Sequence, residues 1–236
     1  MAVPDELFDG LLLYLQIRDW ALEKMKTQPI GGQQLDLEIH QYLYLSNALA
    51  SVDLVGESYY GKDFRTPAYA TDYDKALIAA FDALTRPDLS IAAQEAYAYV
   101  RELRNSVVHR GLGSANAGPA NESHVFALCP ASVVDRAGKN TYRRPWKYVV
   151  ELAEATTRAF NSVIYAELQK HQFFTSEESK IVSASDVKSA IDTCDAMPDW
   201  AKDMAHKTFA QLDLPKLTAE ARANLLRNLK IRLGVI

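Results

Sequence analysis

Residues 104–109 read RNSVVH and place an arginine, an amide and an imidazole within six positions. A guanidinium is always positive and donates several hydrogen bonds, so it suits the stabilisation of charge on a phosphoryl group. An imidazole exchanges protons near neutral pH and suits general acid or base catalysis. Arg104, Asn105 and His109 therefore combine side chains that suit phosphoryl chemistry.

The motif lies near the end of a predicted helix that begins with Ser90 as its N-cap and ends before Gly111. Asn105 and His109 are four residues apart and lie on neighbouring turns, whereas Arg104 and His109 are about 140° apart around the axis. One helix would not bring the arginine and the histidine together, but two copies crossing about a two-fold axis would. The apolar face of this helix would hold Val100, Leu103 and Val107.

A simpler interpretation of the same residues stays open. His109 and Arg110 fall in the last turn of the predicted helix, where positive side chains interact favourably with the helix dipole. Gly111 then supplies the residue that commonly follows a helix end. On this interpretation the segment only terminates a helix, in a bundle with no catalytic role.

The full pattern of Arg104, Asn105 and His109 resembles the signature of the HEPN superfamily, an arginine, a polar residue and a histidine four to six positions after the arginine. The resemblance implies an α-helical homodimer in which both copies of the motif line one cleft. It also implies a metal-independent endoribonuclease that leaves a 2′,3′-cyclic phosphate, with roles in toxin–antitoxin systems or phage defence. Other HEPN members are non-catalytic modules that bind RNA, a nucleotide or a protein partner, and this alternative stays open.

The resemblance also has consequences for partners. RNA, a second copy of the chain and an antitoxin or other protein partner are the expected partners. The HEPN branch that is regulated by adenylylation often carries a tyrosine two positions after the histidine. That position is Gly111 here, so regulation by this route is not expected.

A second segment favours RNA binding. Residues 136–147, RAGKNTYRRPWK, contain no acid and interleave five cations with Tyr142 and Trp146. Cations contact phosphates and aromatic rings stack on bases in proteins that bind single-stranded RNA. The alternative is a solvated turn before a helix, with Trp146 in the core. The candidate RNA-binding residues are Arg101 and Arg110 beside the motif, and Arg136, Lys139, Arg143, Arg144 and Lys147 in this segment.

Helical periodicity dominates the rest of the sequence. The spacing predicts helices over residues 5–26, 35–52, 72–84, with Asp72 as the cap, and 146–168, and further helices in the last fifty residues. Residues 56–71 and 114–122 predict loops, because they are rich in Gly, Pro or Asn and lack a period. The Val-rich stretch near 123–135 predicts one or two short strands. The expected class is mainly α, a HEPN-like helical bundle with a small β element.

Composition limits the organisation and the chemistry. The 236 residues suit a HEPN-like helical domain over 1–175 and a C-terminal helical extension over 180–236, which can pack on the same core. A net charge of −4 requires RNA binding to use local basic patches. The two distant cysteines fit a reducing cytoplasm and argue against a metal site. No cofactor motif is present, and the apolar run LLLYLQI is too short to span a membrane.

Overall fold

The computed structural model describes residues 5–27, 34–62, 64, 71–82, 90–110, 116–119, 125–174 and 184–236. The helices of this part are α1 (Asp5–Thr27), α2 (Gln34–Tyr60), α3 (Asp72–Asp82), α4 (Ala93–Arg110), α5 (Val149–Lys170), α6 (Ala184–Asp192), α7 (Asp199–Phe209) and α8 (Leu214–Arg232). The strands are β1 (Asn116–Pro119), β2 (Val125–Leu128), β3 (Ser132–Val134) and β4 (Thr141–Arg143). The predicted mainly α class with a small β element is confirmed.

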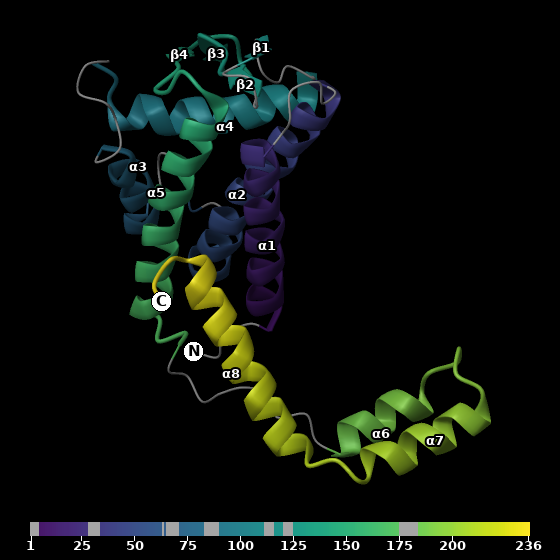
Figure 1. The fold of residues 1–236 in the computed structure, drawn as a ribbon. Coiled ribbons are helices and arrows are strands. Elements are labelled where there is room, and N and C mark those ends of the chain that lie inside the picture. The colour runs from purple at the N-terminus through teal and green to yellow at the C-terminus, as the bar shows by residue number, and fades with distance from the viewer. Residues whose placement is uncertain are drawn as a thin grey trace.

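The main body is a bundle of helices with its β structure at one end. Helices α1, α2 and α5 run side by side, and α4 crosses the end of α5 (Figure 1). Strands β3 and β4 pack on α4. Helix α8 touches this body near its C-terminal end, whereas α6 and α7 form a hairpin that projects away from it (Figure 1).

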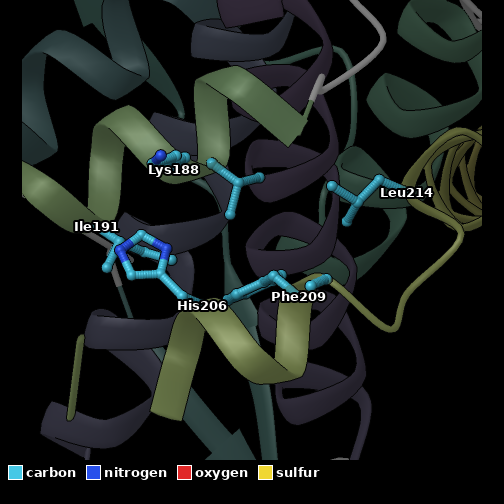
Figure 2. Close-up of a pocket in the computed structure, with 7 residues that line it drawn as sticks. Lys188, Ile191, His206, Phe209 and Leu214 are labelled. Carbon is cyan, nitrogen blue, oxygen red and sulfur yellow. The ribbon is translucent and has the colours of Figure 1, made fainter. Parts of the chain in front are cut away.

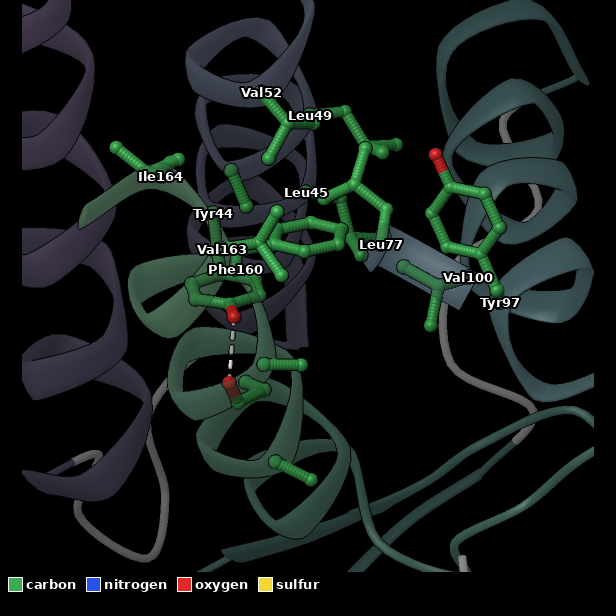
Figure 3. Close-up of a cluster of buried hydrophobic side chains, with 14 of the residues drawn as sticks. Tyr44, Leu45, Leu49, Val52, Leu77, Tyr97, Val100, Phe160, Val163 and Ile164 are labelled. Atoms are coloured by element: carbon green, nitrogen blue, oxygen red, sulfur yellow. Dashed lines mark hydrogen bonds between the residues drawn. The ribbon is translucent and has the colours of Figure 1, made fainter. Parts of the chain in front are cut away.

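The core forms where the apolar faces of five helices meet. Tyr44, Leu77, Val100 and Phe160 come from α2, α3, α4 and α5 and are all essentially inaccessible to solvent (Figure 3). The Tyr44 hydroxyl lies 2.9 Å from the hydroxyl of Thr157, so its polar atom is not left unsatisfied inside the core. The periodicity of the sequence predicted these faces because a helix buries residues three and four positions apart.

Helix α2 is longer than the sequence indicated. It continues to Tyr60, so the prediction of a loop over 56–71 was wrong at its first five positions. The reason lies at Gly56, where a Cβ atom would stand only 2.4 Å from the Phe64 ring. The glycine is tolerated inside the helix because it lets this ring, which is 3% exposed, pack directly against the backbone.

Two predicted helix caps were also wrong. Helix α3 is capped by Thr71, whose hydroxyl accepts a hydrogen bond from the Asp74 amide at 3.2 Å, and Asp72 already lies inside the helix. Helix α4 begins at Ala93, because Ser90 has a φ of 47°, a left-handed conformation that an N-cap does not adopt. The cap of α3 therefore lies one position before Asp72, and α4 begins three positions after Ser90.

The β structure is two antiparallel pairs. Strand β1 pairs with β2, and β3 pairs with β4. The expectation of strands near 123–135 is confirmed by β2 and β3. Their partners lie in segments predicted as a loop and a turn, because a short edge strand tolerates residues such as Gly118 and Pro119 that normally disfavour strands.

The C-terminal helices meet the body at a single region. Leu229 and Leu233 are buried, whereas α7 has no buried residue. The described part of the C-terminal helices therefore buries side chains against the body at the end of α8 and not over α7.

A polar network reinforces this junction. The fully buried guanidinium of Arg18 donates to Asp19 Oδ1 at 2.6 Å and to Asn161 Oδ1 at 2.7 Å. Asn161 Nδ2 donates to the carbonyl of Arg232 at 3.0 Å, and Arg232 Nη1 donates to Asp19 Oδ2 at 2.9 Å. The network joins α1, α5 and α8, and it satisfies a charge that would otherwise be buried without a partner.

Candidate functional site

The motif occupies the last turns of α4. Val100 and Leu103 are fully buried, as the helical projection predicted, and Arg104 and Asn105 are half-buried beside them. His109 lies on the same helix one turn after Asn105. The apolar side of α4 packs into the core and thereby fixes the direction in which the motif residues leave the helix.

Arg104 and Asn105 are joined by hydrogen bonds on the helix surface. Arg104 Nη1 donates to Asn105 Oδ1 at 3.2 Å, and Asn105 Nδ2 donates to Glu102 Oε2 at 3.3 Å. Arg104 Nε is buried, and no acceptor for it is found among the described residues. A buried N–H group without a partner favours an added acceptor, and a phosphate oxygen is one such group.

Arg101, His109 and Arg110 are the other residues of the motif region that could contact RNA. The guanidinium of Arg101 lies over the Tyr97 ring, 5.8 Å from its centroid, so its charge is held close to the helix surface. His109 and Arg110 belong to α4, but their side chains lie outside the described part of the structure. Gly111 also lies outside the described residues.

Arg143 in the basic segment is engaged by a carboxylate. Its Nε donates to Glu95 Oε1 at 3.0 Å and its Nη2 donates to Glu95 Oε2 at 3.1 Å. The backbone amide of Arg143 donates to the same Oε1, also at 3.0 Å. These hydrogen bonds hold the pKa of the Glu95 carboxyl below its usual value. The pair ties β4 to the first turn of α4.

Two other cations of this segment, Arg144 and Lys147, also contact local partners. Arg144 Nη1 donates to the carbonyl of Cys129 at 2.9 Å, and Lys147 lies over the Tyr148 ring at 5.3 Å. Trp146 is buried, so the interpretation that places it in the core is confirmed and it is not exposed for stacking on RNA bases.

Arg136 and Lys139 are exposed in the turn between β3 and β4. The Asp135 carboxylate shapes this turn by accepting hydrogen bonds from the backbone amides of Lys139 and Asn140, at 2.8 and 3.1 Å. Both side chains are accessible to solvent.

The structure reveals a polar cluster that the sequence did not indicate. At the end of α5, Glu167 Oε1 accepts hydrogen bonds from Tyr60 at 2.5 Å and Lys170 at 3.2 Å, and lies 2.8 Å from His171 Nε2. The His171 ring stacks on Tyr59 with the ring centroids 3.8 Å apart. The spacing of Glu167 and His171, four positions apart on one helix, was the signal that could have paired them.

Burial and hydrogen bonds raise the pKa values of two groups in this cluster. It raises the pKa of Tyr59 to about 12, and the nearby Glu167 charge adds to the shift. The pKa of Lys170 is raised mainly by its hydrogen bond to Tyr60. Glu167 therefore gathers a neutral hydroxyl donor from α2 and a lysine donor from α5, an arrangement that ties the two helix ends together.

A pocket of about 400 Å³ lies between α6, α7 and α8 (Figure 2). Its lining is mostly apolar. The residues that line it are Val187, Lys188, Ile191, His206, Phe209, Ala210 and Leu214.

Comparisons with known proteins give no relative. No protein-family model, curated protein or solved structure matches this chain. Across the described ranges, no helix is both long enough and apolar enough to cross a bilayer. Among the same residues, no three His, Cys, Asp or Glu side chains come together in a way that could hold a metal ion.

Proposed function

We propose that this chain is a HEPN-like, metal-independent endoribonuclease that acts in the cytoplasm through a composite site formed by two copies of α4. The main support is the placement of Arg104, Asn105 and His109 on the last turns of one helix that is anchored in the core. Arg104 Nε, for which the described residues hold no acceptor, adds to this support, because a phosphate oxygen would accept a hydrogen bond from it.

The proposed reaction is internal transesterification. The 2′-oxygen of a ribose attacks the adjacent phosphorus, the bond from phosphorus to the 5′-oxygen breaks, and the products are a 2′,3′-cyclic phosphate and a 5′-hydroxyl. One His109 accepts the 2′ proton and the second His109 donates a proton to the leaving oxygen. Arg104 stabilises charge on the phosphoryl oxygens, and Asn105 orients the arginine to which it is bonded.

RNA would reach this site along basic residues of α4 and of the segment that packs on α4. Arg101 and Arg110 flank the motif on α4, and Arg136 and Lys139 extend from the turn between β3 and β4. Arg143, Arg144 and Lys147 are engaged by local partners in the free protein. Their contribution to RNA binding would require these contacts to be exchanged or shared. An antitoxin or another protein partner would regulate the site by covering it.

A non-catalytic HEPN-type module is the second candidate, and one observation favours it. The Glu102 carboxylate lies 3.3 Å from the Asn105 amide and therefore places a negative charge beside the motif. A carboxylate in this position opposes the approach of a phosphate to Arg104. A module that binds a protein partner would tolerate this charge better than a nuclease would.

Cleavage of RNA by the purified protein in the presence of a chelator tests the proposal. We expect single-stranded RNA to be cut and an all-deoxy strand of the same sequence to stay intact, because the nucleophile is the 2′-hydroxyl. His109→Ala should abolish cleavage, and Arg104→Ala should reduce the rate about a hundredfold or more.

Arg158→Ala is the matched control, because it removes an exposed arginine from α5 outside the motif. It should cleave RNA as the wild type does. Cleavage by His109→Ala at the wild-type rate would remove this residue from the mechanism. RNA binding without any cleavage would instead favour the non-catalytic module.

A further inference from the structure

A short chain of hydrogen bonds connects three polar side chains of α4. Asn105 Nδ2 donates to Glu102 Oε2 at 3.3 Å, and Arg104 Nη1 donates to Asn105 Oδ1 at 3.2 Å. All three residues are half-buried. The amide of Asn105 therefore stands between a carboxylate and the guanidinium of the proposed ribonuclease site.

Glu102 determines which end of the Asn105 amide faces Arg104. An amide has a donating end and an accepting end, whereas a carboxylate only accepts hydrogen bonds. The contact with Glu102 Oε2 requires the donating Nδ2, which leaves Oδ1 as the atom that faces the arginine. A reversed amide would place Nδ2 against Nη1, and two donors do not bond to each other. The carboxylate thus selects the orientation in which Asn105 can hold Arg104.

The geometry of the helix keeps Glu102 from pairing directly with Arg104. Residues two positions apart differ by about 200° around the axis, so these two side chains leave α4 on different sides. Asn105 lies three positions after Glu102 and about 60° away, so its amide can bridge the two groups. Arg104 is therefore held by a neutral amide, which is its hydrogen-bond partner among the described residues.

The pair of Arg143 and Glu95 shows the other way in which an arginine can be held near this helix. There the carboxylate accepts from Nε at 3.0 Å and from Nη2 at 3.1 Å, so a phosphate would have to displace a negative charge. Arg104 instead gives one nitrogen to a neutral oxygen, and the described residues hold no acceptor for its Nε. Its charge is held in place without being neutralised.

We propose that Glu102 is a positioning residue of the ribonuclease site and acts on Arg104 through the amide of Asn105. This inference rests on the proposed function, because the phosphate that Arg104 would contact belongs to the RNA substrate. Glu102 itself does not touch the substrate. It fixes the amide, the amide fixes the guanidinium, and the guanidinium stabilises the charge that develops on the phosphoryl oxygens.

The carboxylate of Glu102 has two effects that oppose each other. Its negative charge repels a phosphate, whereas its hydrogen bond orders the arginine before the reaction. Repulsion of the substrate acts on binding and therefore raises KM. Ordering of the arginine acts when charge develops in the transition state and therefore raises kcat. Measurement of both constants separates the two effects.

Steady-state cleavage of single-stranded RNA by the purified full-length protein, with a chelator present, tests the inference. We expect Glu102→Ala to lower kcat by about tenfold to a hundredfold, because the guanidinium loses its fixed orientation. KM should not rise, since the carboxylate no longer repels the substrate. Glu102→Gln should recover most of kcat, because its Oε1 can still accept a hydrogen bond from Asn105.

A double-mutant cycle distinguishes an effect through the amide from any other effect of Glu102. If Glu102 acts through Asn105, Glu102→Ala should not lower kcat further in a chain that already carries Asn105→Ala. An effect that bypasses the amide would lower kcat by the same factor in both backgrounds.

Glu220→Ala is the matched control, because it removes an exposed glutamate from α8, outside the motif. It should keep the wild-type kcat and KM. Circular dichroism checks that every variant is folded.

Three results would overturn this inference and leave the ribonuclease proposal in place. The first is a Glu102→Ala variant with the wild-type kcat. The second is an equal fall in kcat in both backgrounds of the cycle. The third is a Glu102→Gln variant that is no faster than Glu102→Ala. A wild-type protein that cleaves no RNA would instead overturn the proposed function, and with it the role of Glu102.

Discussion

Asp19→Ala should destabilise the protein more than removal of the buried arginine itself. Arg18 is fully buried, and the Asp19 carboxylate is the acid to which it is bonded. Breaking a buried pair by removing one partner costs about 3–5 kcal/mol, because a charge stays buried without compensation. Asp19 is 29% exposed and Asn161 still accepts from Arg18, so we expect a loss at or just below the lower limit of this range, about 2–3 kcal/mol. Loss of the Asp19–Arg232 pair adds about 0.5 kcal/mol.

A double-mutant cycle with Arg18→Met separates the two causes. Met removes the buried charge and keeps much of the side-chain volume, so the double variant should recover about 1–2 kcal/mol relative to Asp19→Ala. Urea unfolding at one protein concentration measures the free energies, with the unfolding slopes compared among variants. Strict additivity of the two substitutions, or an Asp19→Ala variant within about 0.5 kcal/mol of the wild type, would refute the reasoning.

Three further predictions follow from particular residues. Gln172 has a φ of 56°, so Gln172→Gly should raise the free energy of unfolding by about 1 kcal/mol, and the same substitution at Gln169 within α5 should lower it by a similar amount. Urea unfolding measures both, and a loss of stability in Gln172→Gly would contradict the prediction. A thiol reagent should modify one cysteine in the native protein and two after denaturation. Cys129 is buried and its pKa is raised to about 12, whereas Cys194 is partly accessible. Rapid native labelling of both thiols would contradict this result. Burial also raises the pKa of Tyr44 from 10.0 to about 12. The stability that depends on neutral Tyr44 is thus complete below pH 10 and lost as the pH rises toward 12. Tyr44→Phe should flatten this decline in unfolding experiments, and an unchanged decline would argue against this cause.

The sequence predicted the elements that depend on local periodicity. The faces that hold Val100, Leu103 and Phe160 follow directly from spacing, because a helix buries residues at intervals of three and four. The sequence did not decide whether Trp146 lies in the core or stacks on RNA bases, because the composition of its segment fits both roles. Only tertiary packing placed it in the core.

Features that depend on distant contacts could not be predicted in this way. Gly56 appeared to begin a loop, and its tolerance inside α2 depends on the Phe64 ring, which the chain brings back only after a turn. The pairing of Arg143 with Glu95 joins residues 48 positions apart. The sequence indicated the charge of Arg143 but not its hydrogen bonds to Glu95. The sequence therefore predicted which residues of one helix form the candidate site, but it did not predict their hydrogen bonds.

Glu167 shows how a functional-looking cluster can arise from structure alone. Tyr60, Lys170 and His171 all lie within hydrogen-bond distance of one carboxylate oxygen at the ends of α2 and α5. In the sequence, Tyr60 and Glu167 are 107 positions apart and no local pattern links them. Their meeting follows from the lengths of the two helices, which bring both C-terminal ends to one place.

The Arg18 network cannot form completely until translation has reached Arg232. Arg18 is synthesised early, but the carbonyl to which it donates belongs to Arg232, 214 residues later. At about 5–20 residues per second, a ribosome needs about 10–40 seconds to cover this distance. During that time the arginine must stay hydrated or use temporary partners. A product that terminates before Arg232 would lack this acceptor and the attachment of the end of α8 to α1 and α5.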